Sequence, residues 1–249
     1  MNRNLLVVLF LFVGITASQA QTADEIIAKY FENTGGIEKW KAIQGIKISA
    51  KVNQGGMEIP LEIVQLKDGR QMTTITFQGK EIKQGVFDGS SLWSTNFMTM
   101  KAEKSDAETT ENFKVDLGEF PDPFLNYKDR GLKVELLGKE NVEGSETFKI
   151  KLTKKPIKVD GKETDNVSFY YFDAENFIPL MVESEINSGQ AKGMISQNKM
   201  SDYQEVGGLM MPFSMAQGIK GQASQALTIT NIELNPKVEA SAFAIPADK

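Results

Sequence analysis

The 249-residue chain contains no cysteine and no histidine. The absence of cysteine excludes disulfides, thiolate zinc sites and cysteine nucleophiles, and the absence of histidine excludes every acid–base scheme built on imidazole. Basic residues are also scarce relative to acidic ones, 28 against 33, and the net charge of -5 argues against a surface that neutralises nucleic-acid phosphates. We therefore expect no metal site, no cofactor and no nucleic-acid partner.

Long hydrophobic runs are lacking as well. The longest begins at Leu5 and ends at Ile15, whereas a membrane span needs roughly 20 apolar residues. It follows Arg3 and precedes the small residues Ser18 and Ala20, a pattern that predicts a Sec signal peptide over residues 1–20. No cysteine follows to carry a lipid anchor. We expect cleavage after Ala20 and export to the periplasm of one β domain, residues 21–249, that neither spans nor is anchored to a membrane.

The chain that remains is of ordinary globular composition, 41% hydrophobic and 24% charged. Its first segment carries a capping-box pattern, Thr22 with Glu25, which predicts a helix start, and Gly35-Gly36 predicts its end. Apolar residues at helical spacing follow the cap and recur in a second short turn: Ile26, Ile27, Tyr30, Phe31, then Ile37, Trp40 and Ile43. We predict an N-terminal helical hairpin with one apolar stripe.

From Ile46 the hydrophobic period changes to two, which predicts β-strands. Turn pairs such as Asp68-Gly69, Asp88-Gly89, Asp160-Gly161 and Gly207-Gly208 separate the strand-like runs and favour successive antiparallel hairpins. After a first hairpin of alternating residues over 46–52 and 57–63, the expected strands are 70–77, 80–87, 91–101, 132–137, 147–153, 167–173, 180–187, 192–203, 209–219 and 226–234.

One stretch, Lys104 to Lys128, interrupts the sheet pattern. It contains a helix expected over residues 106–115, followed by a segment rich in proline and aromatic residues over 120–127. Long insertions of this kind are often lids or binding loops. The run Val167 to Phe172 is apolar on both faces, so we expect it to be covered on both sides, by the helical hairpin or the proline-rich segment.

Two patterns suggest catalysis, and neither is convincing. Ser196 and Lys199 match a serine-hydrolase spacing, but in a strand residues three apart face opposite sides. Glu183 and Glu185 would share a strand face, which is also what a solvated strand requires. We expect no enzymatic activity; a carboxylate-dependent hydrolase is the weaker alternative.

Apolar side chains remain the best candidate for function. Methionine is flexible and polarisable and suits a pocket for chains of variable shape, although such residues can equally fill a core. A filled core would instead indicate an interaction module of the cell envelope. The residues predicted to line a hydrophobic cavity are Phe77, Phe87, Trp93, Met98, Met100, Phe124, Phe169, Tyr171, Met181, Met194, Met211 and Phe213.

The order of these elements, with several short motifs, resembles the LolA/LolB-like superfamily of outer-membrane lipoprotein-sorting proteins. The motifs are Gly35-Gly36-Ile37-Glu38-Lys39-Trp40, Val206-Gly207-Gly208-Leu209-Met210-Met211-Pro212, and Ile232-Glu233-Leu234-Asn235-Pro236 followed by Phe243 and Pro246. The resemblance implies a mainly β fold, an unclosed antiparallel barrel of about eleven strands whose concave face is covered by the helical hairpin and the insertion. It also implies a non-enzymatic periplasmic carrier of lipid or lipoprotein acyl chains, with inner- and outer-membrane sorting components as partners; a related lipid-binding or sensor role fits equally.

Overall fold

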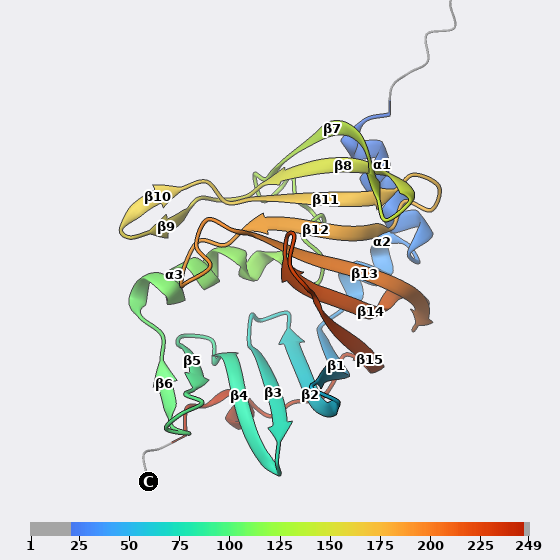
Figure 1. The fold of residues 1–249 in the computed structure, drawn as a ribbon. Coiled ribbons are helices and arrows are strands. Elements are labelled where there is room, and N and C mark those ends of the chain that lie inside the picture. The colour runs from blue at the N-terminus through green and yellow to red at the C-terminus, as the bar shows by residue number, and fades with distance from the viewer. Residues whose placement is uncertain (1–20, 247–249) are drawn as a thin grey trace, which may run out of the picture.

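The computed structural model describes residues 21–246, so the predicted signal peptide lies outside the described residues. One curved antiparallel sheet of thirteen strands runs in the order β6-β5-β4-β3-β2-β1-β15-β14-β13-β12-β11-β8-β7. Its edge strands, β6 and β7, do not pair with each other (Figure 1). The expectation of an unclosed antiparallel barrel is therefore confirmed.

The strands have the following bounds: β1 Gly45–Gln54, β2 Met57–Leu66, β3 Gln71–Phe77, β4 Lys80–Phe87, β5 Leu92–Thr95, β6 Ala102–Lys104, β7 Lys133–Val142, β8 Ser145–Thr153, β11 Val167–Asp173, β12 Pro179–Glu185, β13 Ile195–Val206, β14 Leu209–Ile219 and β15 Gln225–Leu234. A separate hairpin pairs β9, Ile157–Val159, with β10, Lys162–Thr164. The helices are α1 Ala23–Asn33, α2 Ile37–Ala42 and α3 Ala107–Asp116, with short 3-10 turns η1 Leu117–Glu119 and η2 Ala240–Phe243.

The sheet has thirteen strands, two more than the family resemblance implied and one more than the twelve expected from the sequence pattern, and the extra strand has a local cause. Residues 91–101, expected as one strand, are broken by a turn at Asn96. The Asn96 N–H donates to the Lys101 carbonyl and the Asn96 carbonyl accepts from Met100 N–H, each at 2.8 Å. β5 and β6 therefore form a hairpin instead of a single strand.

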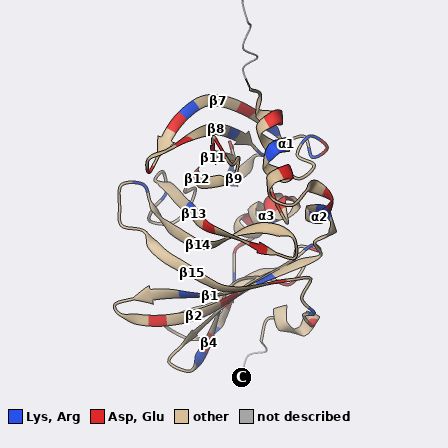
Figure 2. Ribbon diagram, turned by 90° about the vertical axis from the view of Figure 1, so that its right-hand side faces the viewer, with Lys and Arg blue, Asp and Glu red and all other residues tan. Residues whose placement is uncertain are grey.

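The predicted helical hairpin forms α1 and α2. Thr22 and Glu25 make the capping box, with Glu25 N–H donating to Thr22 Oγ1 at 3.2 Å and Thr22 N–H to Glu25 Oε2 at 2.8 Å. Helix α1 lies beside the sheet strands (Figure 2), and its apolar stripe is buried against their concave face. Gly35 adopts φ +111° where α1 meets the β13–β14 turn, and a Cβ there would lie 2.1 Å from the Gly208 carbonyl oxygen. Only glycine fits this approach.

The proline-rich segment covers β11 together with α1. The Phe124 ring lies 4.7 Å from that of Tyr170 and 5.5 Å from that of Phe172, and Tyr30 lies 5.5 Å from Phe172. The concave side of β11 is thus covered as expected. On the convex side, within residues 21–246, Phe169 and Tyr171 are covered by side chains of neighbouring strands, Val142, Met181 and Lys149, and not by the helical hairpin or the proline-rich segment.

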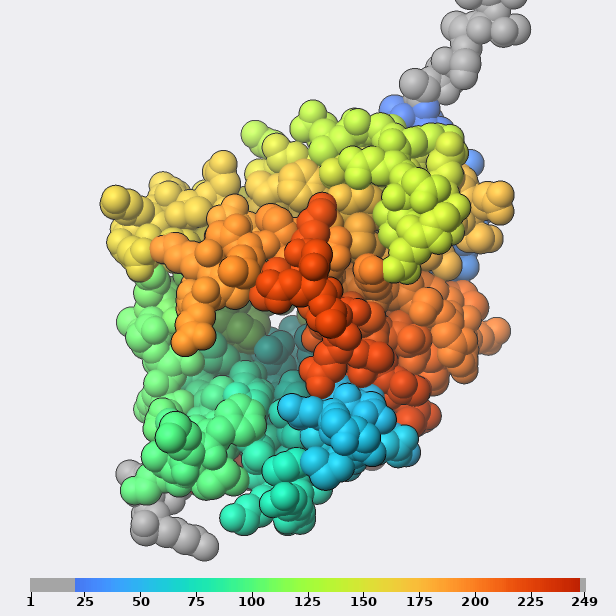
Figure 3. All heavy atoms as spheres, in the orientation of Figure 1, coloured from blue at the N-terminus to red at the C-terminus, as the bar shows by residue number. Residues whose placement is uncertain are grey.

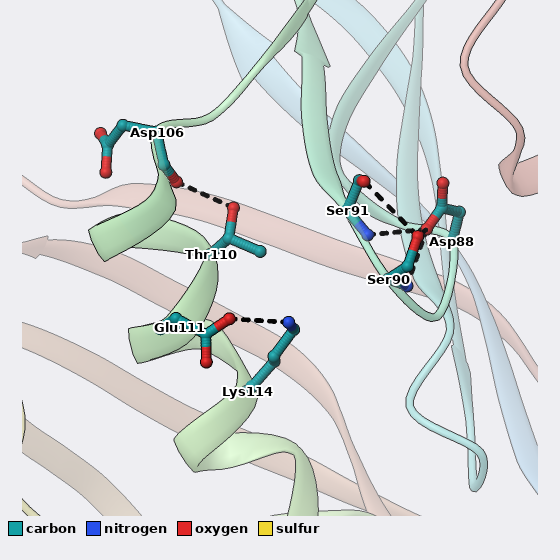
Figure 4. Close-up of polar contacts among 7 residues, drawn as sticks. All are labelled: Asp88, Ser90, Ser91, Asp106, Thr110, Glu111 and Lys114. Atoms are coloured by element: carbon teal, nitrogen blue, oxygen red, sulfur yellow. Dashed lines mark hydrogen bonds and ion pairs between the residues drawn. The ribbon is translucent and has the colours of Figure 1, made fainter.

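Helix α3 lies between the two ends of the open sheet (Figure 1). Asp106 caps it, accepting from Thr109 N–H at 2.7 Å, and Figure 4 shows its carbonyl bonded to Thr110. On one side the Phe113 ring lies 5.0 Å from that of Phe87. On the other, the Glu108 carboxylate accepts from backbone N–H groups of the β9–β10 turn. The helix therefore bridges β4 and the β9–β10 hairpin.

The segment that follows β15 packs on the convex face of the first strands. The Phe243 side chain is fully buried in a cluster with Val64, Met72, Val86 and Trp93. The indole Nε1 of Trp93 donates to the Phe243 carbonyl at 2.9 Å. In the described part of the chain, no helix is long and apolar enough to cross a bilayer.

Candidate ligand-binding site

A cavity of about 690 Å³ lies on the concave face of β1–β4, β14 and β15. Cross-strand pairing builds its wall: Leu61 pairs with Ile75, and Ile75 with Ile82, so apolar side chains form a continuous row across three strands. Val52 extends it by pairing with Ile59 on β2 and with Leu227 on β15. The full lining is Val52, Gln54, Ile59, Leu61, Ile63, Thr73, Ile75, Phe77, Ile82, Phe97, Met215, Gln217, Gln225 and Leu227.

This lining carries no charged residue. Its polar members are Thr73 and the side-chain amides of Gln54, Gln217 and Gln225. Gln217 on β14 pairs with Gln225 on β15. Binding of an apolar guest to such a wall is favourable, because the contact removes apolar surface from water. The wall offers no counter-ion for a buried charge. Its volume falls in the range of roughly 300–1,000 Å³ typical of small-molecule sites.

The cavity opens at one end of the sheet. Phe97, in the β5–β6 turn, both lines it and is 61% exposed, so this ring marks the mouth. Figure 3 shows a hollow framed by the β12–β13 loop, the β14–β15 turn and the first strands. Side chains therefore fill the concave face beneath α1 and α2, which is what the alternative of an interaction module predicted for the whole face. Over β1–β4 the concave face is open.

The structure distributes the twelve predicted cavity residues over four environments. Phe77 lines the cavity. Four others lie in or beside the covered core. Phe87 packs against α3, Phe124 belongs to the proline-rich segment that covers β11, and Met211 and Phe213 of β14 lie in or against the core cluster. Four lie on the convex face: Trp93 beneath Phe243, and Phe169, Tyr171 and Met181 in a small cluster with Val142. Three occupy exposed turns: Met98, Met100 and Met194.

The missed wall residues had a usable signal in the sequence. Ile59, Leu61 and Ile63 occupy alternate positions in β2, with Glu58 and Glu62 on the other face, and the structure leaves Leu61 and Ile63 half-buried. Alternation shows that one face is apolar, but it does not tell whether helices cover that face. The choice of large aromatic and methionine side chains selected residues that fill cores, whereas the open wall is mostly aliphatic.

The residues considered for hydrolysis do not form a catalytic pair. Ser196 Oγ donates to the Ser184 carbonyl, whereas Lys199 pairs with Glu143. Glu183 is 5% exposed and lies on the convex face, where it accepts from Lys220 Nζ at 2.9 Å. Burial alone would raise the pKa of Glu183, but hydrogen bonds from Lys220, Gln197 and Tyr171 outweigh it and lower the pKa. The Glu183 carboxylate therefore stays ionised and does not suit a general acid. Within residues 21–246, no three acidic side chains lie together in a group that could hold a metal ion.

A buried hydrogen bond ties α1 to the proline-rich segment. Tyr30 OH donates to Asp122 Oδ2 at 2.8 Å, and Asp122 Oδ1 accepts from the Phe124 N–H at 2.8 Å. Burial raises the pKa of the Asp122 carboxyl from 3.8 to about 6, against the opposing effect of these hydrogen bonds. The Asp122 carboxyl, which links α1 to the proline-rich segment, therefore changes charge at a pH of about 6.

This raised pKa predicts that Asp122 makes its own contribution to stability in mild acid, opposite in sign to that of the carboxyls whose pKa values are lowered. Between pH values near 4 and 6 the folded state holds a proton on Asp122 that the unfolded chain has lost. The Asp122 contribution to the free energy of unfolding should therefore fall by about 2–3 kcal/mol as the pH rises through this window, and level off above it. The Asp122→Asn variant should lack this component, as urea titrations at several pH values would measure. Parallel stability curves for the two proteins would contradict the assignment.

Comparison with known proteins supports the fold. The structure is similar to a LolA superfamily protein from Nitrosomonas europaea, with TM-score 0.51 and 14% identity over 90% of this chain and 98% of that one. A DUF1329 family protein from Desulfovibrio piger gives 0.51 and 16% over 88% and 97%. A domain from Vibrio parahaemolyticus, described as belonging to an outer membrane lipoprotein-sorting protein, gives 0.50 and 11% over 88% and 94%.

These likenesses show the LolA-like fold and confirm the architecture that the sequence motifs implied. No protein-family profile matches the chain, and no curated protein does. The cavity described above is therefore the feature of this molecule that bears most directly on its function.

Proposed function

We propose that this protein binds acyl chains of lipids or lipoproteins in the cavity of β1–β4, β14 and β15, and carries them without chemical change. The single observation that carries the proposal is an uncharged, mostly aliphatic cavity of about 690 Å³ on the concave face, open at one end of the sheet. A wall of half-buried Leu61, Ile63 and Ile75 leaves apolar surface in contact with water until a guest covers it.

The expected driving force is sufficient for a carrier. Each methylene transferred from water contributes about 0.8 kcal/mol, so ten methylenes give roughly 8 kcal/mol before ordering costs are subtracted. The three glutamine amides in the lining suit the ester or amide groups at the polar end of an acylated ligand. No catalytic residue is needed for this role.

The cellular setting completes the proposal. The predicted signal peptide and the absence of an anchoring cysteine favour a periplasmic carrier that moves between inner- and outer-membrane sorting components. A protein described as lipoprotein-sorting among the structures of similar fold supports the same role.

Titration with a fluorescent 16-carbon acyl probe tests the proposal. We expect saturable binding with one site per chain, and displacement by unlabelled diacylglycerol or by a synthetic diacylated lipopeptide. Probe emission should shift as the chain leaves water. Emission that rises linearly with protein, with no saturation and no displacement, would contradict the proposal.

A further inference from the structure

The exposed apolar side chains are unevenly distributed. Seven large hydrophobic residues are exposed in the described chain. Five of them lie in or directly beside turns: Met57 53%, Phe97 61%, Met98 95%, Met100 38% and Met194 43% exposed. The two others, Ile37 in α2 and Leu137 in β7, lie elsewhere.

The topology places these five residues at one end of the sheet. In an antiparallel order, the turns β1–β2, β3–β4 and β5–β6 fall at the same end, and pairing of β1 with β15 brings the β14–β15 turn and the β12–β13 loop there too. We call them the mouth turns: residues 55–56, 78–79, 96–101, 186–194 and 220–224. They surround the hollow seen in Figure 3, and Phe97 belongs to both turn and cavity.

The most exposed of the mouth turns is firmly built. Asn96 Oδ1 accepts from the N–H groups of Met98 at 2.8 Å and of Thr99 at 3.1 Å, and the Asn96 side-chain amide donates to Glu103. Met100 adopts φ +58°, a conformation that glycine takes more easily. The turn therefore holds apolar side chains in water although their exposure stabilises nothing in the isolated protein.

Charge separates the two ends of the sheet. The mouth turns contain Lys101, Lys192 and Lys220 and no acidic residue. The β8–β11 connection, residues 154–166, lies at the same end and adds four lysines and three acidic residues, Asp160, Glu163 and Asp165, so this end keeps an excess of positive charge. Lys192 and Lys220 pair with Asp160 and Glu183 respectively. The turns at the opposite end carry four acidic residues, Asp68, Asp88, Glu143 and Glu175, against two basic ones, Lys67 and Arg70. An anionic surface would thus meet less repulsion at the mouth end than at the other end.

We propose that the mouth turns dock onto the surface of a lipid bilayer, with Met57, Phe97 and Met98 entering the headgroup region. The mouth turns are separate from one another and suit the headgroup region of a bilayer. Individual side chains can insert there without a flat complementary surface. Docking at this end would place the open mouth of the cavity against the layer from which an acyl chain is taken or to which it is given. This inference goes beyond ligand binding and can hold even if the cavity takes a different guest.

Vesicle co-sedimentation tests the docking surface. We would use vesicles of phosphatidylethanolamine and phosphatidylglycerol, and vesicles of phosphatidylcholine alone. The wild-type protein should sediment with both, more strongly with the anionic vesicles. The double variant Met57→Asp with Met98→Asp should lower the partition coefficient about ten-fold or more, because two apolar contacts are replaced by carboxylates.

The matched control is the double variant Ile37→Asp with Leu137→Asp, which changes two similarly exposed residues away from the mouth. It should bind vesicles as the wild-type protein does. All four positions lie outside the cavity lining, so both variants should keep acyl-probe binding, which separates failure of docking from failure of the proposed function. Absence of wild-type binding to either vesicle, or equal loss in both variants, would overturn the proposal.

Discussion

Placing an aspartate at Ile75 is expected to abolish acyl-chain binding without unfolding the protein. Ile75 lies in the middle of the cavity wall, between Leu61 and Ile82, and is half-buried. In the empty cavity the new carboxylate can stay hydrated. A bound acyl chain would remove that water without offering a counter-ion, at a cost of several kcal/mol. Affinity for the fluorescent acyl probe should fall about 100-fold or more.

The matched control is Thr76→Asp, one residue further along β3 on the other face and exposed. It adds the same charge to the same strand and should leave probe affinity unchanged. Far-ultraviolet circular dichroism would verify that both variants are folded. Equal probe affinity in the Ile75→Asp and wild-type proteins would remove this strand from the binding site.

Replacing Phe243 by alanine should cause a large loss of stability. The Phe243 ring is fully buried on the convex face, and the Arg70 guanidinium lies 5.3 Å from its centroid. Truncating a buried phenylalanine typically costs about 3–5 kcal/mol, which urea denaturation would measure. Acyl binding should be retained below the transition, because the cavity lies on the other face of the same strands.

Phe97→Ala provides the matched comparison, since it removes the same atoms from a ring that is 61% exposed. Its cost should stay within about 0.5 kcal/mol. If the two substitutions cost the same free energy of unfolding, the segment after β15 would not be packed on the sheet as described.

The sequence predicts the scaffold well where local chemistry is sufficient. The capping box at Thr22 and the stripe from Ile26 to Phe31 define α1, and strict alternation defines β1 and β2. The prediction from sequence is wrong where a single polar side chain forms a turn inside an expected strand. Asn96 divides an expected strand because its amide can bond two consecutive backbone N–H groups, a preference that competes with strand pairing.

The cavity itself is harder to predict, because its position depends on which face of each strand the helices leave open. Phe169 and Tyr171 alternate with Tyr170 and Phe172, and nothing in this run tells which pair turns towards α1. The structure places Tyr170 and Phe172 under the helices, while Phe169 and Tyr171 lie beneath Lys149 on the convex face. The alternation along a strand tells which side chains share a face. Only the tertiary arrangement decides which of the two faces is concave and which is convex.

A photoactivatable fatty acid, crosslinked to the protein and mapped by peptide mass spectrometry, tests the site most directly. The proposal predicts adducts on β1, β2 and β3, with further labelling at Phe97, and their loss when excess unlabelled lipid competes. Adducts confined to the Phe169–Tyr171 cluster on the convex face, or labelling that unlabelled lipid does not reduce, would contradict it.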